Sequence, residues 1–599
     1  MNARAGSGRT HKPAVAGAIL LLWAMLAAFP VRASDSVTPP AASAPAATGA
    51  EDSSRKEQSV EDQGAGDANA RKPSGRGIDA SEPVSTTRHR LEVQGAPLAY
   101  TATAGRLPVE IDGTTKANIF FVSYERSGDR ILAEERPVTF VFNGGPGAAS
   151  AYLHLGALGP RRLVLDDDGG IPQAPARLAV NQETWLTFTD LVFIDPVGTG
   201  YSQRADANDE KQSAFWETRT DLRSLAEFIR LYLTRNNRRL SPVFLVGESY
   251  GGFRAAALAE ILTTDSGVGL NGVVLVSPVL EFSLMDGDDY ALLPWALLLP
   301  AYAATALAHD RADFAKDGGN LAQTLQPVEA FSLNSYLTGM AEGEGLSSEA
   351  RAELYKQIES FTGLSADVIK RYRGRIPRQA FARELLASEA RFVSLYDGSI
   401  AGIDPSPESA WRVGHDPVLQ GLTAPLTSAL VAYVRDDLGY ESDRRYELLN
   451  QNVSRAWQWR EDDQTQGYLG VADELKAAMS LNHNLQVLIA HGYYDLVTSY
   501  FASRYVVDQM DLDAAIRPNL TLVTYNGGHM FYTRTQARRR LAEDARAFFR
   551  EATIDRADEA NGFEPAGPFR RTNSRAERDL PGLAPPAGAS VTRLSRGDP

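Results

Sequence analysis

The sequence contains no cysteine in 599 residues and only eight histidines. The absence of cysteine excludes disulfide bonds and lipid modification of an N-terminal cysteine. A core of the size that this chain can build does not require disulfides, even in an oxidising compartment. No cluster of cysteine or histidine resembles a metal site, so we expect neither a metal nor another cofactor.

Basic residues are also in deficit. The chain has 61 Lys and Arg against 75 Asp and Glu, which gives a net charge of −14 and a pI near 5.2. Proteins that bind nucleic acid carry a basic face, so a nucleic-acid partner is not expected.

The only long apolar stretch near the N-terminus, residues 14–29, is short for a membrane span. Basic residues precede it, and small residues stand at the two recognition positions before Ser34. This pattern predicts a secretory signal peptide over residues 1–33, and a mature protein that is periplasmic or secreted, with no stable membrane anchor.

Residues 34–88 and 556–599 are rich in small, polar and charged residues and poor in large apolar ones. Such segments cannot bury enough apolar surface to fold, so we predict a disordered linker and a disordered tail.

A serine stands between two glycines in residues 247–251, GESYG. The apolar run 243–246 before it predicts a buried strand, and residues 253–260 after it predict a helix. This is the setting of a nucleophile elbow, a strained turn that exposes a serine at a helix N-terminus. An ordinary turn serine is the alternative interpretation of Ser249.

A serine hydroxyl is a weak nucleophile and needs a base, which an acid in turn orients. In a fold with such an elbow, the acid and then the histidine follow the serine, each just past a strand. Asp495 follows the predicted strand 485–490, and His529 follows the predicted strand 520–525. We therefore predict a catalytic triad of Ser249, Asp495 and His529; a turn aspartate and a surface histidine are the alternatives.

The other histidines fit the role of base less well. His491 is the main rival because it lies four residues before Asp495, but its position relative to the final strand is wrong. The remaining six lie in the leader, at the edge of the folded part or in other segments: His11, His89, His154, His309, His415 and His483.

Residues 137–142 predict another strand, and the glycine-rich sequence NGGPG follows at 143–147. Glycines after a buried strand let backbone N–H groups approach a developing oxyanion, where each donor contributes roughly 3–4 kcal/mol. The N–H of Tyr250, directly after the nucleophile, is the expected partner donor. A plain Gly/Pro turn is the alternative.

Four segments, in this order, resemble the serine carboxypeptidases, peptidase family S10. They are 142–147 (FNGGPG), 193–202 (FIDPVGTGYS), 247–252 (GESYGG) and 528–530 (GHM). The family usually reads N-G-G-P-G, D-x-P-x-G-x-G-[FY]-S, G-E-S-Y-[AG]-G and G-H-M at these points. Together the segments span most of residues 90–550.

The resemblance implies functions for individual residues. Ser249, Asp495 and His529 would form the triad, and Gly145 and Tyr250 would supply the oxyanion hole. The substrate-binding residues would be Asn143, Gly144 and Glu248, of which Asn143 and Glu248 would hold the C-terminal carboxylate of a peptide.

The chain departs from the family pattern in three ways. Residues 148–150 read AAS where the family usually continues with Cys-Ser-Ser, and the family's disulfides cannot form. Ala157 stands where members that prefer acidic pH carry a glutamate paired with the one in G-E-S-Y. Glu248 therefore has only Asn143 as a motif-matched helper, and the carboxylate site is expected to be incomplete.

Between the two halves lies a long segment that is mainly helical in pattern, for example over 290–309, 328–341 and 348–361. Pro294 and Pro300 are expected to break the first of these helices. In an open parallel sheet such an insertion covers the carboxyl ends of the strands.

We therefore predict an α/β-hydrolase fold, with a mostly parallel central sheet and helices on both faces. The core would comprise residues 89–284 and 480–555, and residues 285–479 would form an inserted helical cap. Within the apolar stretch 292–300, a role as the cap's own core is favoured over a substrate-binding wall.

The expected activity is that of a serine exopeptidase, a carboxypeptidase that cleaves the C-terminal bond of a peptide through an acyl-enzyme. Because Ala157 weakens the carboxylate argument, an esterase, acyltransferase or aminopeptidase on the same framework stays open. A secreted binding protein without catalysis is a more remote alternative, against which the complete triad argues.

Overall fold

The computed structural model describes residues 84–554 apart from 112, 114, 129–134, 206–214, 316–319, 410–414 and 460–468. The predicted signal peptide, the predicted tail and all but the end of the predicted linker lie outside the described residues. Strand β1 begins at Ser85, so the folded part starts slightly before residue 89.

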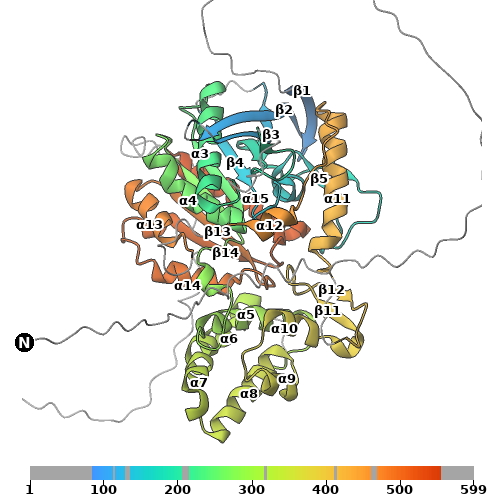
Figure 1. The fold of residues 1–599 in the computed structure, drawn as a ribbon, viewed down its shortest axis with the longest axis vertical. Helices are drawn as coiled ribbons and strands as arrows, with labels where there is room; N and C mark the ends of the chain where they lie inside the picture. Colours follow the sequence, from blue (N-terminus) through green and yellow to red (C-terminus); the bar gives the residue numbers. More distant parts are fainter. Residues whose placement is uncertain are drawn as a thin grey trace, which may run out of the picture. The chain divides into compact units, whose positions relative to one another are not determined.

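A ten-stranded sheet forms the centre of the fold (Figure 1), in the order β1-β2-β3-β7-β4-β9-β10-β13-β14, with β8 paired to β3. Strands β1, β2, β3 and β7 pair antiparallel, and the strands from β7 to β14 run parallel. The strands are Ser85–Val93 (β1), Ala96–Ile111 (β2), Thr115–Arg126 (β3), Val138–Phe142 (β4), Asp190–Ile194 (β7), Gln203–Arg204 (β8), Val243–Glu248 (β9), Gly272–Val276 (β10), Gln486–Gly492 (β13) and Leu520–Tyr525 (β14). The mostly parallel sheet of an α/β-hydrolase fold is confirmed.

The parallel strands β4, β7, β9, β10 and β13 are buried on both faces, whereas the edge strand β14 is partly exposed. In β9, Val243 and Leu245 belong to one apolar core, and Phe244 and Val246 belong to the other. Side chains alternate across a strand, so a strand covered on both sides needs an unbroken apolar run. The run at 243–246 satisfies this requirement.

Helices cover both faces of the sheet (Figure 1). One core receives residues from α3 (Thr218–Arg235), α4 (Tyr250–Thr264), α13 (Ala472–Leu481) and α14 (Tyr500–Gln509). The other core receives residues from α2 (Ala151–Leu153), α11 (Leu419–Ala432) and α15 (Thr535–Thr553). Short antiparallel strands, β5 (Arg161–Leu163) and β6 (Leu178–Val180), pair outside the main sheet.

The helices between residues 285 and 479 divide between two bodies. A third apolar core is built by the first group, which we call the cap helices: α5 (Leu293–Ala308), α6 (Leu321–Phe331), α7 (Leu337–Glu342), α8 (Ser348–Thr362), α9 (Ala366–Arg371) and α10 (Arg378–Glu384). The hairpin of β11 (Arg391–Val393) and β12 (Ala401–Ile403) adjoins them. By contrast, α11, α12 (Gln451–Ala456) and α13 pack in the cores beside the sheet.

The prediction that proline breaks the first cap helix was wrong for Pro300. Pro294 lies in the first turn of α5, where its missing N–H needs no partner, and Pro300 lies inside the same helix. Most of α5 is buried in the cap core, including Leu297 and Leu299. Tertiary packing therefore outweighs the local cost of the proline.

In the described ranges, no helix combines the length and apolar content needed to cross a membrane. The same residues contain no group of three or more His, Asp or Glu side chains arranged to hold a metal ion.

Candidate active site

Ser249 lies in the sharp turn between β9 and α4. Its backbone, at φ 62° and ψ −124°, is in a region that residues other than glycine rarely adopt. The turn leaves no room for side chains on either side: a Cβ at Gly247 would lie 1.8 Å from the carbonyl oxygen of Gly251. A Cβ at Gly251 would lie 2.6 Å from the carbonyl oxygen of Phe142. The two glycines are thus steric requirements of the strand-to-helix turn.

His529 and Asp495 follow the neighbouring strands β14 and β13, and their side chains meet. Nδ1 of His529 lies 2.8 Å from Oδ2 of Asp495, and both side chains are buried. Oδ1 of Asp495 accepts the N–H groups of Val497 and Thr498, at 2.8 and 2.9 Å. The Thr498 hydroxyl donates to Oδ2 at 2.8 Å. Thr498, which sequence patterns did not single out, therefore helps to fix the carboxylate that orients the imidazole.

The electrostatic setting of His529 suits a base. Burial by itself lowers the pKa of the imidazole, but the charge and hydrogen bond of Asp495, with the charge of Glu248, raise the pKa above its usual value. An imidazole held in this way accepts a proton readily and is stabilised as the imidazolium.

Ser249 and His529 flank the same turn at the end of β10. The Ser277 hydroxyl donates to the carbonyl oxygen of His529 at 2.8 Å. The N–H of Val279 donates to the carbonyl oxygen of Ser249 at 3.4 Å. The Ser249 hydroxyl makes no hydrogen bond within the described part of the chain. Catalytic hydrogen bonds often form fully only when substrate binds, so this geometry is compatible with attack by Ser249.

His491 lies within β13 and is fully buried. Its Nε2 lies 2.8 Å from the Ser503 hydroxyl, and burial lowers its pKa to about 4. His154 is likewise buried, with Nε2 2.7 Å from the Tyr124 hydroxyl and its pKa lowered by burial to about 3. Both imidazoles have the environment of neutral packing groups.

The glycine-rich loop after β4 lies against the N-terminus of α4. A Cβ at Gly144 would be 2.5 Å from the backbone nitrogen of Tyr250, and Gly145 has a φ of 100°. Tyr250 is the first residue of α4, where the helix offers its N–H no partner. The loop thus lies close to the helix N-terminus, and the N–H groups of Gly145 and Tyr250 stay the predicted oxyanion donors.

A buried arginine holds this loop in place. Nη1 of Arg254 donates to the carbonyl oxygen of Asn143 at 2.6 Å, and its Nε and Nη2 donate to the two carboxylate oxygens of Asp221 at 2.7 and 3.2 Å. The guanidinium also stacks on the ring of Tyr250, 4.8 Å from its centroid. An arginine in a mostly apolar helix after the elbow was the sequence signal for this role.

Glu248 precedes the nucleophile and is buried beside Asn143. Its Oε2 accepts hydrogen bonds from Nδ2 of Asn143 at 2.6 Å and from the Tyr532 hydroxyl at 2.7 Å. Burial raises the pKa of Glu248 to about 7. Asn143 is the motif-matched helper that was expected, and Tyr532, which lies just outside the G-H-M motif, is a second donor that no sequence pattern marked.

Part of the chain is similar in sequence to known serine carboxypeptidases. Residues 96–284 match the model of the serine carboxypeptidase family. Serine carboxypeptidase-like 35 of Arabidopsis thaliana is 30% identical over 199 residues, which are 31% of this chain and 39% of the relative. Over residues 96–284, the chain is therefore similar in sequence to the serine carboxypeptidase family.

The match to the carboxypeptidase family covers only part of each protein. A pheromone-processing carboxypeptidase of Yarrowia lipolytica is 28% identical over 201 residues, 33% of this chain and 29% of the relative. The chain thus spans well under half the length of these relatives. Among solved structures, a proline iminopeptidase of Mycobacterium smegmatis is similar with a TM-score of 0.31 and 12% identity, over 75% of this chain and 98% of the other.

Asp495 and His529 lie outside the region that matches the carboxypeptidase family, and a segment from the cap holds their loops together. The N–H of His529 donates to the carbonyl oxygen of Tyr396 at 2.5 Å, and the two rings meet edge to face. The N–H of Gly528 and Nε of Arg534 both contact Oδ2 of Asp397, at 3.1 and 3.2 Å. We call residues 394–399 the inner cap segment.

The inner cap segment also contacts the loop that carries Asp495. The N–H of Leu496 donates to the carbonyl oxygen of Leu395 at 3.0 Å. The N–H of Gly398 donates to the carbonyl oxygen of Tyr494 at 2.8 Å. The segment therefore lies between the loops of the two triad residues predicted after β13 and β14.

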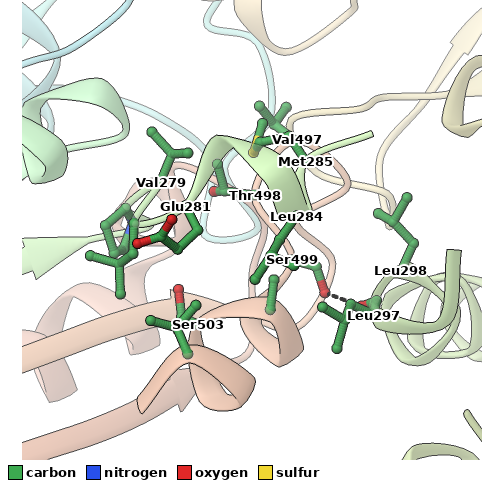
Figure 2. Close-up of a pocket in the computed structure, with 14 residues that line it drawn as sticks. Val279, Glu281, Leu284, Met285, Leu297, Leu298, Val497, Thr498, Ser499 and Ser503 are labelled. Carbon is green, nitrogen blue, oxygen red and sulfur yellow. Dashed lines mark hydrogen bonds between the residues drawn. The ribbon is translucent and has the colours of Figure 1, made fainter. Parts of the chain in front are cut away.

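A small cavity lies beside Thr498 (Figure 2). Its volume is about 20 Å³, and its walls include Val279, Leu297, Thr498 and Ser503. The Ser499 hydroxyl, which donates to the carbonyl oxygen of Leu297 at 2.7 Å, ties α14 to cap helix α5 at its edge. This volume suffices for about one water molecule and is too small for a substrate side chain.

Proposed function

We propose that this protein is a serine carboxypeptidase. Ser249 attacks the carbonyl carbon of the last peptide bond, and His529 takes the hydroxyl proton and gives it to the leaving amine. Asp495 keeps the imidazole in the required tautomer, and N–H groups of Gly145 and Tyr250 bind the oxyanion. Water then attacks the acyl-enzyme with His529 again as base, which releases the shortened peptide.

Specificity for a free C-terminus rests on the residues directly beside the nucleophile. A carboxyl group binds a carboxylate only when it carries a proton, because two bare carboxylates repel. With a pKa raised by burial to about 7, Glu248 keeps that proton at acidic pH and loses it as pH rises through neutral. The buried contact between Asn143 and Glu248, one residue before Ser249, is the observation that supports this proposal best.

Mass spectrometry of blocked peptides tests the proposal. We expect release of the single C-terminal residue from a peptide with a blocked N-terminus, and no release by the Ser249→Ala variant. A fluorophosphonate probe should label the protein and spare that variant. Release of N-terminal residues from unblocked peptides would favour an aminopeptidase, and absence of labelling would favour a binding protein.

An esterase on the same framework is the second candidate, because Ala157 occupies the place of the family's second glutamate. It predicts hydrolysis of simple esters with no preference for peptides that have a free C-terminus.

We also infer that the protein acts outside the cytoplasm, in the periplasm or after secretion. The predicted signal peptide over residues 1–33 supports this inference.

A further inference from the structure

Glu248 contacts a tyrosine that lies outside the four motifs. Tyr532 belongs to the 3-10 helix η10 (Phe531–Thr533), which begins two residues after His529. Its hydroxyl and Nδ2 of Asn143 donate to the same oxygen, Oε2 of Glu248, at 2.7 and 2.6 Å. All three side chains are buried. Oε2 therefore already accepts two hydrogen bonds, and Oε1 makes none within the described part of the chain.

Tyr532 reaches Glu248 from beside the position where the family carries its second glutamate. A Cβ at Gly156 would lie 2.7 Å from the Tyr532 ring, so the ring packs directly on the π-helix η1 (His154–Leu158). Ala157, the next residue of η1, is buried. The small residues at 156 and 157 make room for the tyrosine where a longer side chain is expected in the family.

We propose that Tyr532 takes the place of the missing glutamate beside Glu248 and fixes which carboxyl oxygen of Glu248 carries the proton that a C-terminal carboxylate binds. An amide N–H can only donate, and the tyrosine hydroxyl donates to the same oxygen, so both contacts require Oε2 to be an acceptor. The proton of neutral Glu248 then resides on Oε1. From there the O–H donates to the substrate carboxylate, and no second carboxyl group is needed. This inference rests on the proposed carboxypeptidase function.

The same contacts govern the proton affinity of Glu248. Titratable side chains face it from five elements: Asp495 after β13, His529 after β14, Tyr532 in η10, Tyr152 in α2 and Tyr396 in the inner cap segment. Burial raises the pKa of Glu248, while the charge of His529 and the hydrogen bonds from Tyr532 and Asn143 oppose that rise. Removing the Tyr532 hydroxyl therefore raises the pKa further, because the anion loses a donor.

Calorimetric binding in the Ser249→Ala background, which prevents turnover, tests the inference. The ligands are two N-blocked dipeptides that differ only in a free or an amidated C-terminus, titrated from pH 5 to 9. We expect affinity for the free acid to fall above neutral pH, and Tyr532→Phe to move the midpoint of that fall upward by about one pH unit. Affinity for the amide should show no such fall in either protein.

Tyr500→Phe is the matched control, because it removes another buried hydroxyl that donates to a glutamate, Glu329, at 2.9 Å. We expect it to leave the midpoint unchanged. Whether Tyr532→Phe folds is tested in a protein that keeps Ser249. The measurements are thermal unfolding and fluorophosphonate labelling. In a Glu248→Gln background, which cannot titrate, Tyr532→Phe should cause no shift.

The outcomes separate the inference from the proposed function. Preference for the free acid with the same midpoint in Tyr532→Phe would overturn the role of Tyr532 and leave the carboxypeptidase proposal standing. A shift in the Glu248→Gln background would also overturn it. Equal affinity of the parent protein for acid and amide would refute the carboxylate site, and the role of Tyr532 with it.

Discussion

Glu248 must be protonated and His529 must be deprotonated for the proposed reaction, although both lie in one buried site. The base must be neutral to accept the proton of Ser249, and its pKa is raised above the usual value by Asp495 and Glu248. The carboxyl group must be neutral to bind a carboxylate, and its pKa is raised by burial to about 7. Protonation of either group changes the pKa of the other, so the two titrate as a coupled pair.

The proposed triad predicts graded losses of activity. Ser249→Ala and His529→Ala should each abolish hydrolysis, because the two residues act as a unit. Asp495→Asn should reduce kcat by about 10⁴, because the amide favours the wrong imidazole tautomer. Steady-state kinetics together with circular dichroism measures these effects. Normal turnover in His529→Ala would disprove the assignment and direct attention to His491.

Glu248 should also make stability depend on pH. Its pKa is about 7 in the folded protein, above the ordinary value of 4.5. Its contribution to the free energy of unfolding is therefore fully present below pH 4.5 and is lost as pH rises through 7. This contribution is roughly 3 kcal/mol at most. Denaturant unfolding should show that Glu248→Gln loses less stability between pH 5 and 8 than the parent protein does. The same loss in both proteins would mean that Glu248 is ionised throughout.

At the scale of elements, the inner cap segment connects the two loops that carry the predicted base and its acid. Tyr396 contacts His529 through a backbone hydrogen bond and ring packing, and Asp397 accepts from both Gly528 and Arg534. The inner cap segment thus positions the histidine that the core supplies.

Asp397→Ala should therefore impair catalysis through position rather than chemistry. Loss of its contacts to the loop of His529 should lower kcat by about 10- to 100-fold and slow fluorophosphonate labelling, since misplacement by about 1 Å is costly. Glu389→Ala, which removes the partner of Arg311 in a half-exposed cap ion pair, is the control and should change neither. Equal labelling rates in Asp397→Ala and the parent would refute the positioning role.

The elements that sequence patterns predicted well are those with local signals. The strand predicted over 520–525 matches β14, since β-branched and aromatic residues run through it, and the elbow glycines identified the turn at Ser249. Tyr532, Thr498 and Tyr396 could not be found in this way. Tyr532 and Tyr396 contact Glu248 and His529, which lie in other elements. Thr498 contacts Asp495 only three residues away, but a buried tyrosine or threonine is common in any core.

For the whole molecule, the pattern of residues 285–479 showed helices but not where they pack. Helices α11 and α13 join the cores beside the sheet, and α5 builds the cap core. An apolar face specifies burial and not a partner, so only the three-dimensional arrangement assigns each helix.

Export is the prediction that concerns the chain as a whole. Edman sequencing of mature protein from the native host should begin near Ser34, because small residues stand before the predicted cleavage site. Recovery of the intact chain from the cytoplasmic fraction would contradict the signal peptide.

The central claim is that a protonated Glu248 beside Ser249 selects peptides with a free C-terminus. The most direct test is kcat/KM from pH 5 to 9 for two N-blocked peptides that differ only in a free or an amidated C-terminus. We predict a bell-shaped profile for the free acid, because His529 must lose a proton and Glu248 must keep one. The amide should give a slow reaction that rises with pH to a plateau. Profiles of the same shape and height for both peptides would contradict the account.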